Sequence, residues 1–295
     1  MNRREMLLAS GAAALGLSAF PVRWVAAQDK KKQKVLYFSR SQTFEHDPVK
    51  LRHGGPSLSD EWFTKLGQKA GIEFVCTKDG AVFDGDLDQY DGFIFYVTGD
   101  LTKPCSDPRA NPGAPMSATG KQKFLDAVKG GKGFVGIHSA TDAFHTPPNR
   151  IDPYTAMIGG EFIIHGPQQT AVMKVTDPKF PGMQGLDGSF KSWDEWYTLY
   201  KFAKDLHVIL VQETEGMRGR MYQRPPYPAT WAHLSGKGHV FYTSMGHGNR
   251  TWEKNKIFRQ VLTGGLAWSL GNAKAEVPPN IAEVTPDAEV LLRAR

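Results

Sequence analysis

The chain has 295 residues, with 36 Lys and Arg against 30 Asp and Glu, which gives a formal net charge of +6. Its composition is 40% apolar, 22% charged and 11% aromatic, which excludes a disordered, collagen-like or disulfide-dense protein. The length suits one large domain or two small ones. The one basic run, residues 30–34, predicts a solvated linker, and we expect no binding of nucleic acid.

The N-terminus carries the features of an export signal. Arg3 and Arg4 precede a small, apolar stretch over residues 9–20, and residues 25–27 (VAA) supply a peptidase site. Paired arginines indicate the twin-arginine route, with an ordinary Sec leader or an uncleaved anchor as the alternatives. We predict a signal peptide over residues 1–27 and a periplasmic or secreted mature protein. The apolar stretch is too short for a convincing membrane span, and we expect none in the mature protein.

The two cysteines are Cys76 and Cys105. Their sequence positions do not show whether their Cα atoms lie within bonding distance. Neither has the spacing of a zinc site. We expect two free thiols, with one disulfide as the alternative.

The mature chain, residues 28–295, alternates strand and helix patterns. Short apolar runs with the length of doubly buried strands occur at Lys34–Ser39, Ile72–Cys76, Gly92–Thr98 and Gly133–His138. Helical patterns occur at Ser59–Ala70, Gly120–Lys129 and residues 255–270, the last weakened by Gly264 and Gly265. Later strands are expected at Ala171–Val175, Trp196–Tyr200, Val208–Val211 and Gly238–Ser244. This order predicts one α/β domain with a core over about 33–272, a parallel sheet covered on both sides, and a surface tail over 273–295.

Polar loops follow the predicted strands. In such sheets, ligands bind beyond the carboxyl ends of the strands, where the loops with His46, Gly99 and His138 would meet. His138 stands at the centre of a Gly-Ile-His-Ser-Ala elbow, where a hydrolase or an amidotransferase would place Ser or Cys. An imidazole there suits a metal ligand or an acid/base, so we reject a serine or cysteine nucleophile. A histidine that only caps the following helix is the alternative.

Further histidines and carboxylates follow later in the chain. His165 and His247 end a predicted segment or follow a glycine, and Asp194 and Glu195 are adjacent. Scattered histidines with one carboxylate match a catalytic zinc site, in which three protein ligands leave a position open. The chain has no HExxH spacing, so the spacing alone does not decide between a metal site and structural histidines.

The mature sequence resembles the ThuA-like (trehalose utilisation) family over nearly its whole length. The resemblance rests on residues 44–46 (FEH), 136–142 (GIHSATD), Tyr154, 159–165 (GGEFIIH), 194–197 (DEWY), 228–231 (PATW), 236–242 (GKGHVFY) and 246–247 (GH). It implies a flavodoxin-like three-layer α/β/α sandwich, similar to class I glutamine amidotransferases but without their cysteine nucleophile.

The resemblance also implies catabolism of trehalose and related sugars through 3-keto intermediates, beside a sugar dehydrogenase that acts upstream. A ketone at C3 acidifies the C2 proton, so a base can remove it and expel the C1 substituent, after which water adds back. We therefore predict metal-dependent cleavage of 3-keto-glycosides. The alternatives are a keto-sugar isomerase or epimerase and a non-catalytic carbohydrate-binding protein. An ordinary glycosidase stays open, although adjacent strand residues such as Asp194 and Glu195 point to opposite faces.

Candidate roles follow for individual residues. The predicted ligands of a divalent metal (zinc or similar) are His138, His165 and Glu195, with His247 as a further candidate. The predicted acid/base residues are His46, Asp142 and His247. The predicted substrate contacts are Gly99, Tyr154, Trp196 and Tyr197, and for the last two, packing in the core is the alternative.

Overall fold

The structure is a computed structural model that describes residues 32–291. The predicted signal peptide, residues 1–27, lies outside the described residues. Within the described part, no helix is both long enough and apolar enough to cross a membrane.

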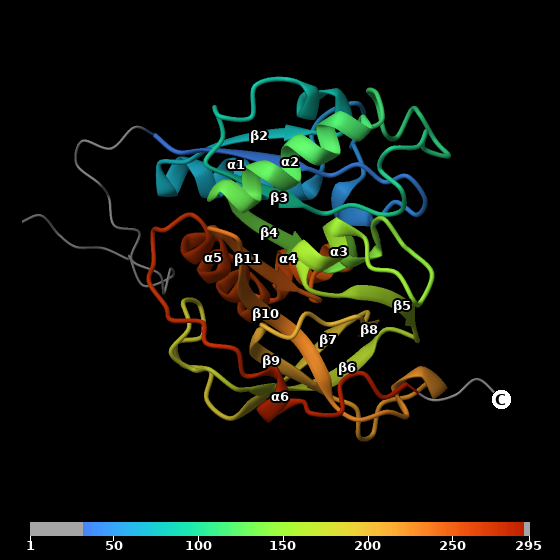
Figure 1. The fold of residues 1–295 in the computed structure, drawn as a ribbon, viewed down its shortest axis with the longest axis vertical. Coiled ribbons are helices and arrows are strands. Elements are labelled where there is room, and N and C mark those ends of the chain that lie inside the picture. Colours follow the sequence, from blue (N-terminus) through green and yellow to red (C-terminus); the bar gives the residue numbers. More distant parts are fainter. Residues whose placement is uncertain (1–31, 292–295) are drawn as a thin grey trace, which may run out of the picture.

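Five strands form the parallel half of a nine-stranded sheet (Figure 1). In spatial order they are β2 (Glu73–Thr77), β1 (Lys34–Phe38), β3 (Gly92–Phe95), β4 (Gly133–Ile137) and β11 (Gly238–Thr243). All five were predicted as strands. Their order confirms the predicted α/β fold with a central parallel sheet, and it brings the carboxyl ends of β1, β3, β4 and β11 to one edge.

Four antiparallel strands extend the sheet beyond β11. They are β10 (Tyr227–Ser235), β9 (His207–Glu213), β6 (Gln169–Val175) and β7 (Ser189–Asp194), in that order. The sequence analysis expected β6 and β9 but not β7 or β10.

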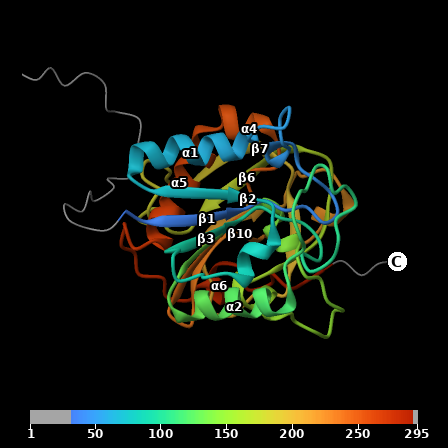
Figure 2. The same cartoon turned by 90° about the horizontal axis from the view of Figure 1, so that it is seen from above.

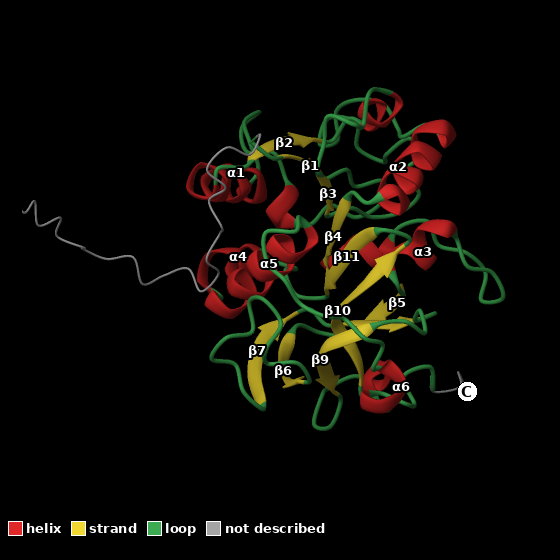
Figure 3. Cartoon of the chain, turned by 60° about the vertical axis from the view of Figure 1, so that its left-hand side comes forward, coloured by secondary structure: helices red, strands yellow, loops and turns green. Residues whose placement is uncertain are grey.

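Helices cover both faces of the sheet, and α1 and α2 lie on opposite sides of it in Figure 2. One face carries α1 (Leu58–Ala70), α4 (Asn249–Lys254) and α5 (Lys256–Ser269), and the other carries α2 (Ala118–Gly130), α3 (Pro153–Ile158) and α6 (Ile281–Val284), as Figure 3 shows. Because successive strand residues point to opposite faces, β1 sends Val35 and Tyr37 into one core and Leu36 and Phe38 into the other.

The helices begin and end where local chemistry predicts. At the start of α1, Ser57 and Asp60 form a reciprocal capping box. At its end, Gly71 takes a left-handed conformation with φ +71°. Three short 3₁₀ segments lie in the connections, η1 (Asp47–Val49), η2 (Gly80–Asp84) and η4 (Arg220–Tyr222).

A second, two-stranded sheet stands on the α2 and α3 side of the molecule. It pairs β5 (Glu161–His165) with β8 (Tyr197–Tyr200) in antiparallel register, with a bulge between Phe162 and Ile164. The predicted strand at Trp196–Tyr200 is therefore present as β8, but in a sheet of its own. β5 packs against the 3₁₀ segment η3 (His138–Asp142), which follows β4.

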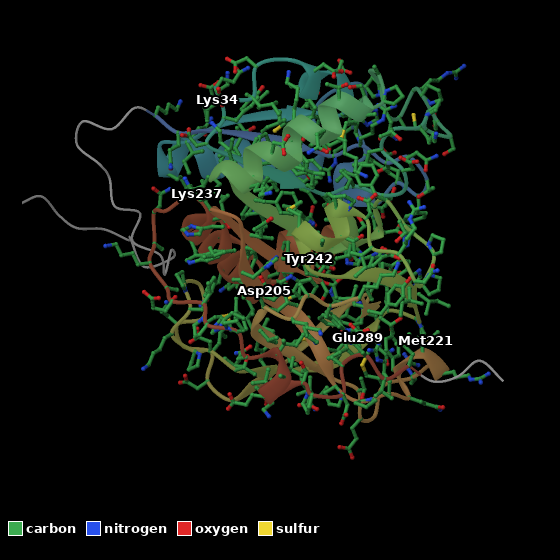
Figure 4. All side chains as sticks on the ribbon, viewed as in Figure 1. Lys34, Asp205, Met221, Lys237, Tyr242 and Glu289 are labelled. Atoms are coloured by element: carbon green, nitrogen blue, oxygen red, sulfur yellow. The ribbon has the colours of Figure 1, made fainter. Side chains whose placement is uncertain are left out.

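The C-terminal residues form a strap over β9 and the end of β8, which we define as residues 278–291. The side chain of Asn280 bonds both the amide and the carbonyl of Val208, at 2.7 and 3.1 Å. The carboxylate of Glu289, labelled at the lower right of Figure 4, accepts from the amide of Phe202 at 2.6 Å. The strap is thus hydrogen-bonded to the sheets it covers. Cys76 and Cys105 are both free.

Candidate metal centre

Three parallel strands each deliver one histidine to the same sheet edge. His46 lies in the loop after β1, His138 directly follows β4, and His247 lies just beyond β11. A carboxylate joins them from the antiparallel half, because Glu195 lies in the corner between β7 and β8. The carboxyl ends of the strands therefore form the site, as the general rule for open α/β sheets predicts.

The four side chains form what we call the histidine cluster: His46, His138, Glu195 and His247. One nitrogen or oxygen atom from each lies within 4.8 Å of those of the others. Glu195 Oε1 lies 3.0 Å from His247 Nδ1 and 3.7 Å from His138 Nε2. The three imidazole rings of the histidine cluster stand nearly perpendicular to one another, with centroids 5.0 to 5.3 Å apart.

Within the described residues, three buried ring nitrogens of the histidine cluster lack a well-formed hydrogen bond, namely His46 Nδ1, His138 Nε2 and His247 Nδ1, although Glu195 Oε1 lies 3.0 Å from the last of them. Buried polar atoms are nearly always paired, so three such atoms in one place point to a missing partner. His138 Nδ1 lies 2.8 Å from the carbonyl of Ser244, which can only accept, so Nδ1 carries a proton and Nε2 faces Glu195. A metal-ligating histidine typically donates the N–H of its other ring nitrogen, the one that faces away from the metal, to a carbonyl or a carboxylate. The donor set therefore fits a divalent ion that takes imidazole and carboxylate ligands.

Burial and neighbouring charges set the protonation of this cluster. Burial, reinforced by the imidazoles of His138 and His247, holds the pKa of His46 well below its ordinary value. Burial opposes ionisation of Glu195, but the same two imidazoles outweigh it and hold its pKa well below the usual range. Glu195 is therefore ionised, which is the state in which a carboxylate binds a metal.

The backbone at His138 is strained. Its φ is +45°, in the left-handed region that β-carbon-bearing residues seldom adopt. The hydroxyl of Tyr242, near the centre of the molecule in Figure 4, donates to the His138 carbonyl at 2.7 Å. β11 therefore holds both the backbone and the ring of His138, since Ser244 follows that strand directly.

Asp194 supports the histidine cluster from behind. Its buried carboxylate accepts from the amides of Gly246 and His247, at 2.9 and 3.1 Å, and from the amide of Glu195 at 3.0 Å. Burial raises the pKa of Asp194, while these hydrogen bonds and the nearby imidazoles act in the opposite direction. The adjacent pair was predicted on one strand. Instead, Asp194 ends β7 and Glu195 lies in the following corner. Asp194 therefore supports the site through hydrogen bonds, and Glu195 belongs to the histidine cluster.

Two predicted site residues lie beside the histidine cluster but outside it. His165 is half-exposed, and its Nδ1 lies 3.2 Å from the second oxygen of Glu195. Asp142 ends η3, and its Oδ1 lies 2.5 Å from Nε2 of His145. The sequence analysis overlooked His145. The signal that could have found it is a histidine three residues after Asp142, in the same polar loop.

The predicted substrate contacts occupy different environments. Tyr154 and Trp196 are fully buried, and their polar atoms donate to the carbonyls of Ala140 and Gln169, so in this structure both belong to the core and the predicted contact with substrate is not supported. Tyr197 is almost fully buried, but its ring lies 4.2 Å from that of His138, and its hydroxyl lies 3.4 Å from His46 Nε2. Gly99 is buried with φ +74°, and its amide donates to the carbonyl of Asp142. It therefore ties two site loops together.

Comparison with known proteins places the chain in a family. The model of the family described as ThuA, trehalose utilisation, matches residues 34–269. The chain belongs to the ThuA family. This family is involved in trehalose utilisation, so the protein has a role in sugar metabolism.

Solved structures of ThuA-like proteins share the fold. One from Bacteroides uniformis is 20% identical, with a TM-score of 0.60 over 85% of this chain and 95% of that one. Another from Parabacteroides merdae is 18% identical, with a TM-score of 0.59 over 84% and 94%. A comparison with curated proteins gives no match. The fold is thus the glutamine-amidotransferase-like α/β sandwich of the ThuA family.

Proposed function

We propose that this ThuA protein is an exported, metal-dependent enzyme that cleaves 3-keto-glycosides by elimination followed by hydration. The observation that carries the proposal is the histidine cluster, with three unpartnered ring nitrogens beside one carboxylate at the ligand-binding edge of the sheet. Membership of a family connected with trehalose utilisation supports a sugar as substrate. The keto group requires an earlier oxidation of the sugar, so a sugar dehydrogenase acts upstream.

The geometry favours a ligand set that differs in part from the predicted one. His138, Glu195 and His247 would hold the ion. His247 Nδ1 lies 3.0 Å and His138 Nε2 lies 3.7 Å from Glu195 Oε1. His165 contacts only the other oxygen of Glu195 and is half-exposed, so we place it beside the substrate. A bound divalent ion supplies Lewis-acid stabilisation of negative charge on a carbonyl oxygen.

The protein's own residues perform the proton transfers. His46 faces the same space with an unpartnered Nδ1, and we assign it the removal of the C2 proton next to the ketone. Loss of that proton lets the C1 substituent depart with its bonding electron pair, and it takes a proton from water. The hydroxide so formed adds to C1 while the same imidazole returns its proton to C2. Tyr197, whose hydroxyl lies near His46 Nε2, keeps the ring of His46 in place.

The test uses mature protein (residues 28–295), a 3-keto-disaccharide and the unoxidised disaccharide, with and without a chelator. We expect cleavage of the keto sugar only, loss of cleavage with chelator, and recovery when a divalent metal is added. His138→Gln should lose bound metal and turnover together, while His46→Gln should keep the metal and lose turnover. Better cleavage of the unoxidised sugar would refute the elimination mechanism.

Other outcomes identify the alternative functions. A keto sugar whose carbonyl moves while the glycosidic bond survives would show an isomerase, which NMR spectra of the products detect. Binding without any turnover by metal-loaded protein would show a carbohydrate-binding protein. His239→Gln is the matched control, because His239 lies at the start of β11, the opposite end of that strand from the site.

A further inference from the structure

A second group of polar side chains lies at the other end of η3, which we call the Asp142 cluster: Asp142, His145, Glu161, Tyr200 and Lys201. His145 bridges two carboxylates, with Nε2 2.5 Å from Asp142 and Nδ1 3.3 Å from Glu161. Glu161 is fully buried and already satisfied, since Tyr200 donates to it at 2.8 Å and the Lys201 ammonium lies 3.0 Å from both of its oxygens.

Two elements connect the Asp142 cluster with the histidine cluster. η3 begins at His138 and ends at Asp142, a span of about 8 Å at the rise of a 3₁₀ helix. β5 begins at Glu161 and ends about 13 Å further along an extended strand at His165, whose Nδ1 lies 3.2 Å from Glu195 of the histidine cluster. These two elements hold the two clusters at a fixed separation.

Aromatic rings fill the space between the clusters. The half-buried Phe162 ring lies 6.3 Å from that of His145 and 4.0 Å from that of Tyr197, which in turn contacts His138. Asp142 contributes one oxygen to His145, and within the described residues no other group bonds its side chain. The Asp142 side chain is 20% exposed, and Phe162 lies against the ring of its partner His145. A carboxylate oxygen and an aromatic ring together suit a sugar, which offers hydroxyl donors and an apolar C–H face.

The backbone beside the Asp142 cluster is strained. Phe144 and Lys201, next to or within the Asp142 cluster, have φ of +58° and +54°, and such strain costs on the order of 1–3 kcal/mol per residue. The His145 side chain is 41% exposed, and an ion pair at that exposure contributes roughly 0–1 kcal/mol, so this pair does not by itself offset the strain. Backbone strain of this kind is concentrated at functional sites.

We propose that Asp142, His145 and Phe162 form a second sugar subsite, which binds the leaving-group ring of a disaccharide whose keto ring lies at the histidine cluster. This inference rests on the proposed function. Asp142 Oδ2 accepts hydroxyl protons of the second ring, the Phe162 ring packs on its C–H face, and His145 fixes the orientation of Asp142. Glu161, paired with Lys201, anchors His145.

The test compares a substrate that has the second ring with one that lacks it. Asp142→Asn and His145→Gln are assayed on a 3-keto-disaccharide and on methyl 3-keto-glucoside, with His239→Gln as control. We expect KM for the disaccharide to rise by roughly tenfold or more, as for a lost hydrogen bond to a charged group, and kcat/KM for the methyl glucoside to stay within about twofold of wild type.

Each other outcome overturns the subsite. Equal losses on both sugars would assign Asp142 to the chemistry or to the fold, and unchanged kinetics on both would show that it contacts neither. Wild-type protein without turnover of either sugar would refute the proposed function. Calorimetric binding of the unoxidised disaccharide then decides the subsite by itself: weaker binding in both variants supports it, and unchanged or absent binding refutes it.

Discussion

At the scale of single residues, the ring of His138 is oriented by groups that are independent of any ligand. The Tyr242 hydroxyl and the Ser244 carbonyl fix its backbone and its Nδ1, and both come from β11 or its end. Nε2 therefore faces Glu195 before anything binds. Such preorganisation lowers the cost of placing an ion, since no side chain has to be reordered.

His145 provides a direct test of the Asp142 cluster. The hydrogen bond to Asp142 raises the pKa of His145, against burial, which lowers it, while the charge of nearby Glu161 also raises it. We expect NMR titration to give a pKa above 6.5 in wild type, and a value closer to 6.5 in Asp142→Asn. The His145→Gln spectrum assigns the resonance. An unchanged pKa in Asp142→Asn would contradict the pairing.

The sign of the pH effect on stability follows from the same shift. The folded state binds the proton of His145 more tightly than the unfolded state does. Its contribution to stability is therefore fully present below about pH 6.5, the ordinary pKa, and is lost as the pH rises through the raised value.

The sequence predicted part of the site for a physical reason. His46, His138 and His247 follow strands whose carboxyl ends share one edge of the sheet, so their meeting could be foreseen. Glu195 was assigned from the family resemblance, because it comes from a corner that no periodic pattern marks. The spacing of Asp142 and His145 was an available signal that was overlooked, whereas Glu161, the second partner of His145, meets it only in the folded chain.

At the scale of elements, the glycine pair in α5 explains why that helix packs closely. The sequence analysis treated Gly264 and Gly265 as a weak point, yet α5 runs unbroken from Lys256 to Ser269. A β-carbon at Gly265 would lie 2.4 Å from the ring of Phe241, and one at Gly264 would lie 2.1 Å from the carbonyl oxygen of Pro181. The absence of side chains there lets the helix approach β11.

Gly265→Ala should therefore destabilise the protein by about 1–3 kcal/mol, the usual cost of overpacking a dense core. Urea unfolding measures the change. The matched control is Gly130→Ala near the end of α2, where a β-carbon meets nothing within 4 Å, so we expect little change or a small gain. Equal stability of the two variants would disprove the close-packing explanation.

The strands that the sequence did not predict share a physical cause. β7 (SFKSWD) and β5 (EFIIH) lie at sheet edges, where exposed positions mix polar and apolar residues and blur the pattern. β10 begins with Tyr227 and Pro228, and its pairing with β9 shifts register there. Four of the five parallel strands were predictable because burial on both faces makes them continuously apolar, whereas β2 lies at the sheet edge and is only half-buried.

At the scale of the whole molecule, the C-terminal strap joins the two sheets. Asn280 bonds β9, while Glu289 accepts from the amides of Lys201 and Phe202 at the end of β8. The buried guanidinium of Arg224 donates to the carbonyls of Leu199 and Ala288, so it ties β8 to the strap. The strap thus holds the small sheet that carries Glu161 and Tyr200 of the Asp142 cluster.

Deletion of residues 278–295 should lower the melting temperature by roughly 10–20 °C. The estimate takes about 1 kcal/mol for each of roughly five lost hydrogen bonds, those of Asn280, Glu289 and Ala288 to the two sheets and Arg224, and 2–4 °C per kcal/mol for a domain of this size. Scanning calorimetry measures it, with Glu283→Ala as control because that side chain is exposed. A shortened chain that melts like wild type would show that the strap is dispensable.

The hydrogen bonds of Asp194 to Gly246 and His247 join the end of edge strand β7 to the loop after β11, although β10, β9 and β6 stand between them in the sheet. The histidine cluster takes its members from residue 46 to residue 247. Contacts so distant along the chain carry a loop-closure entropy cost that local contacts do not. The parallel half of the sheet supplies the three histidines, so the complete histidine cluster, with Glu195, exists only once both halves of the sheet have come together.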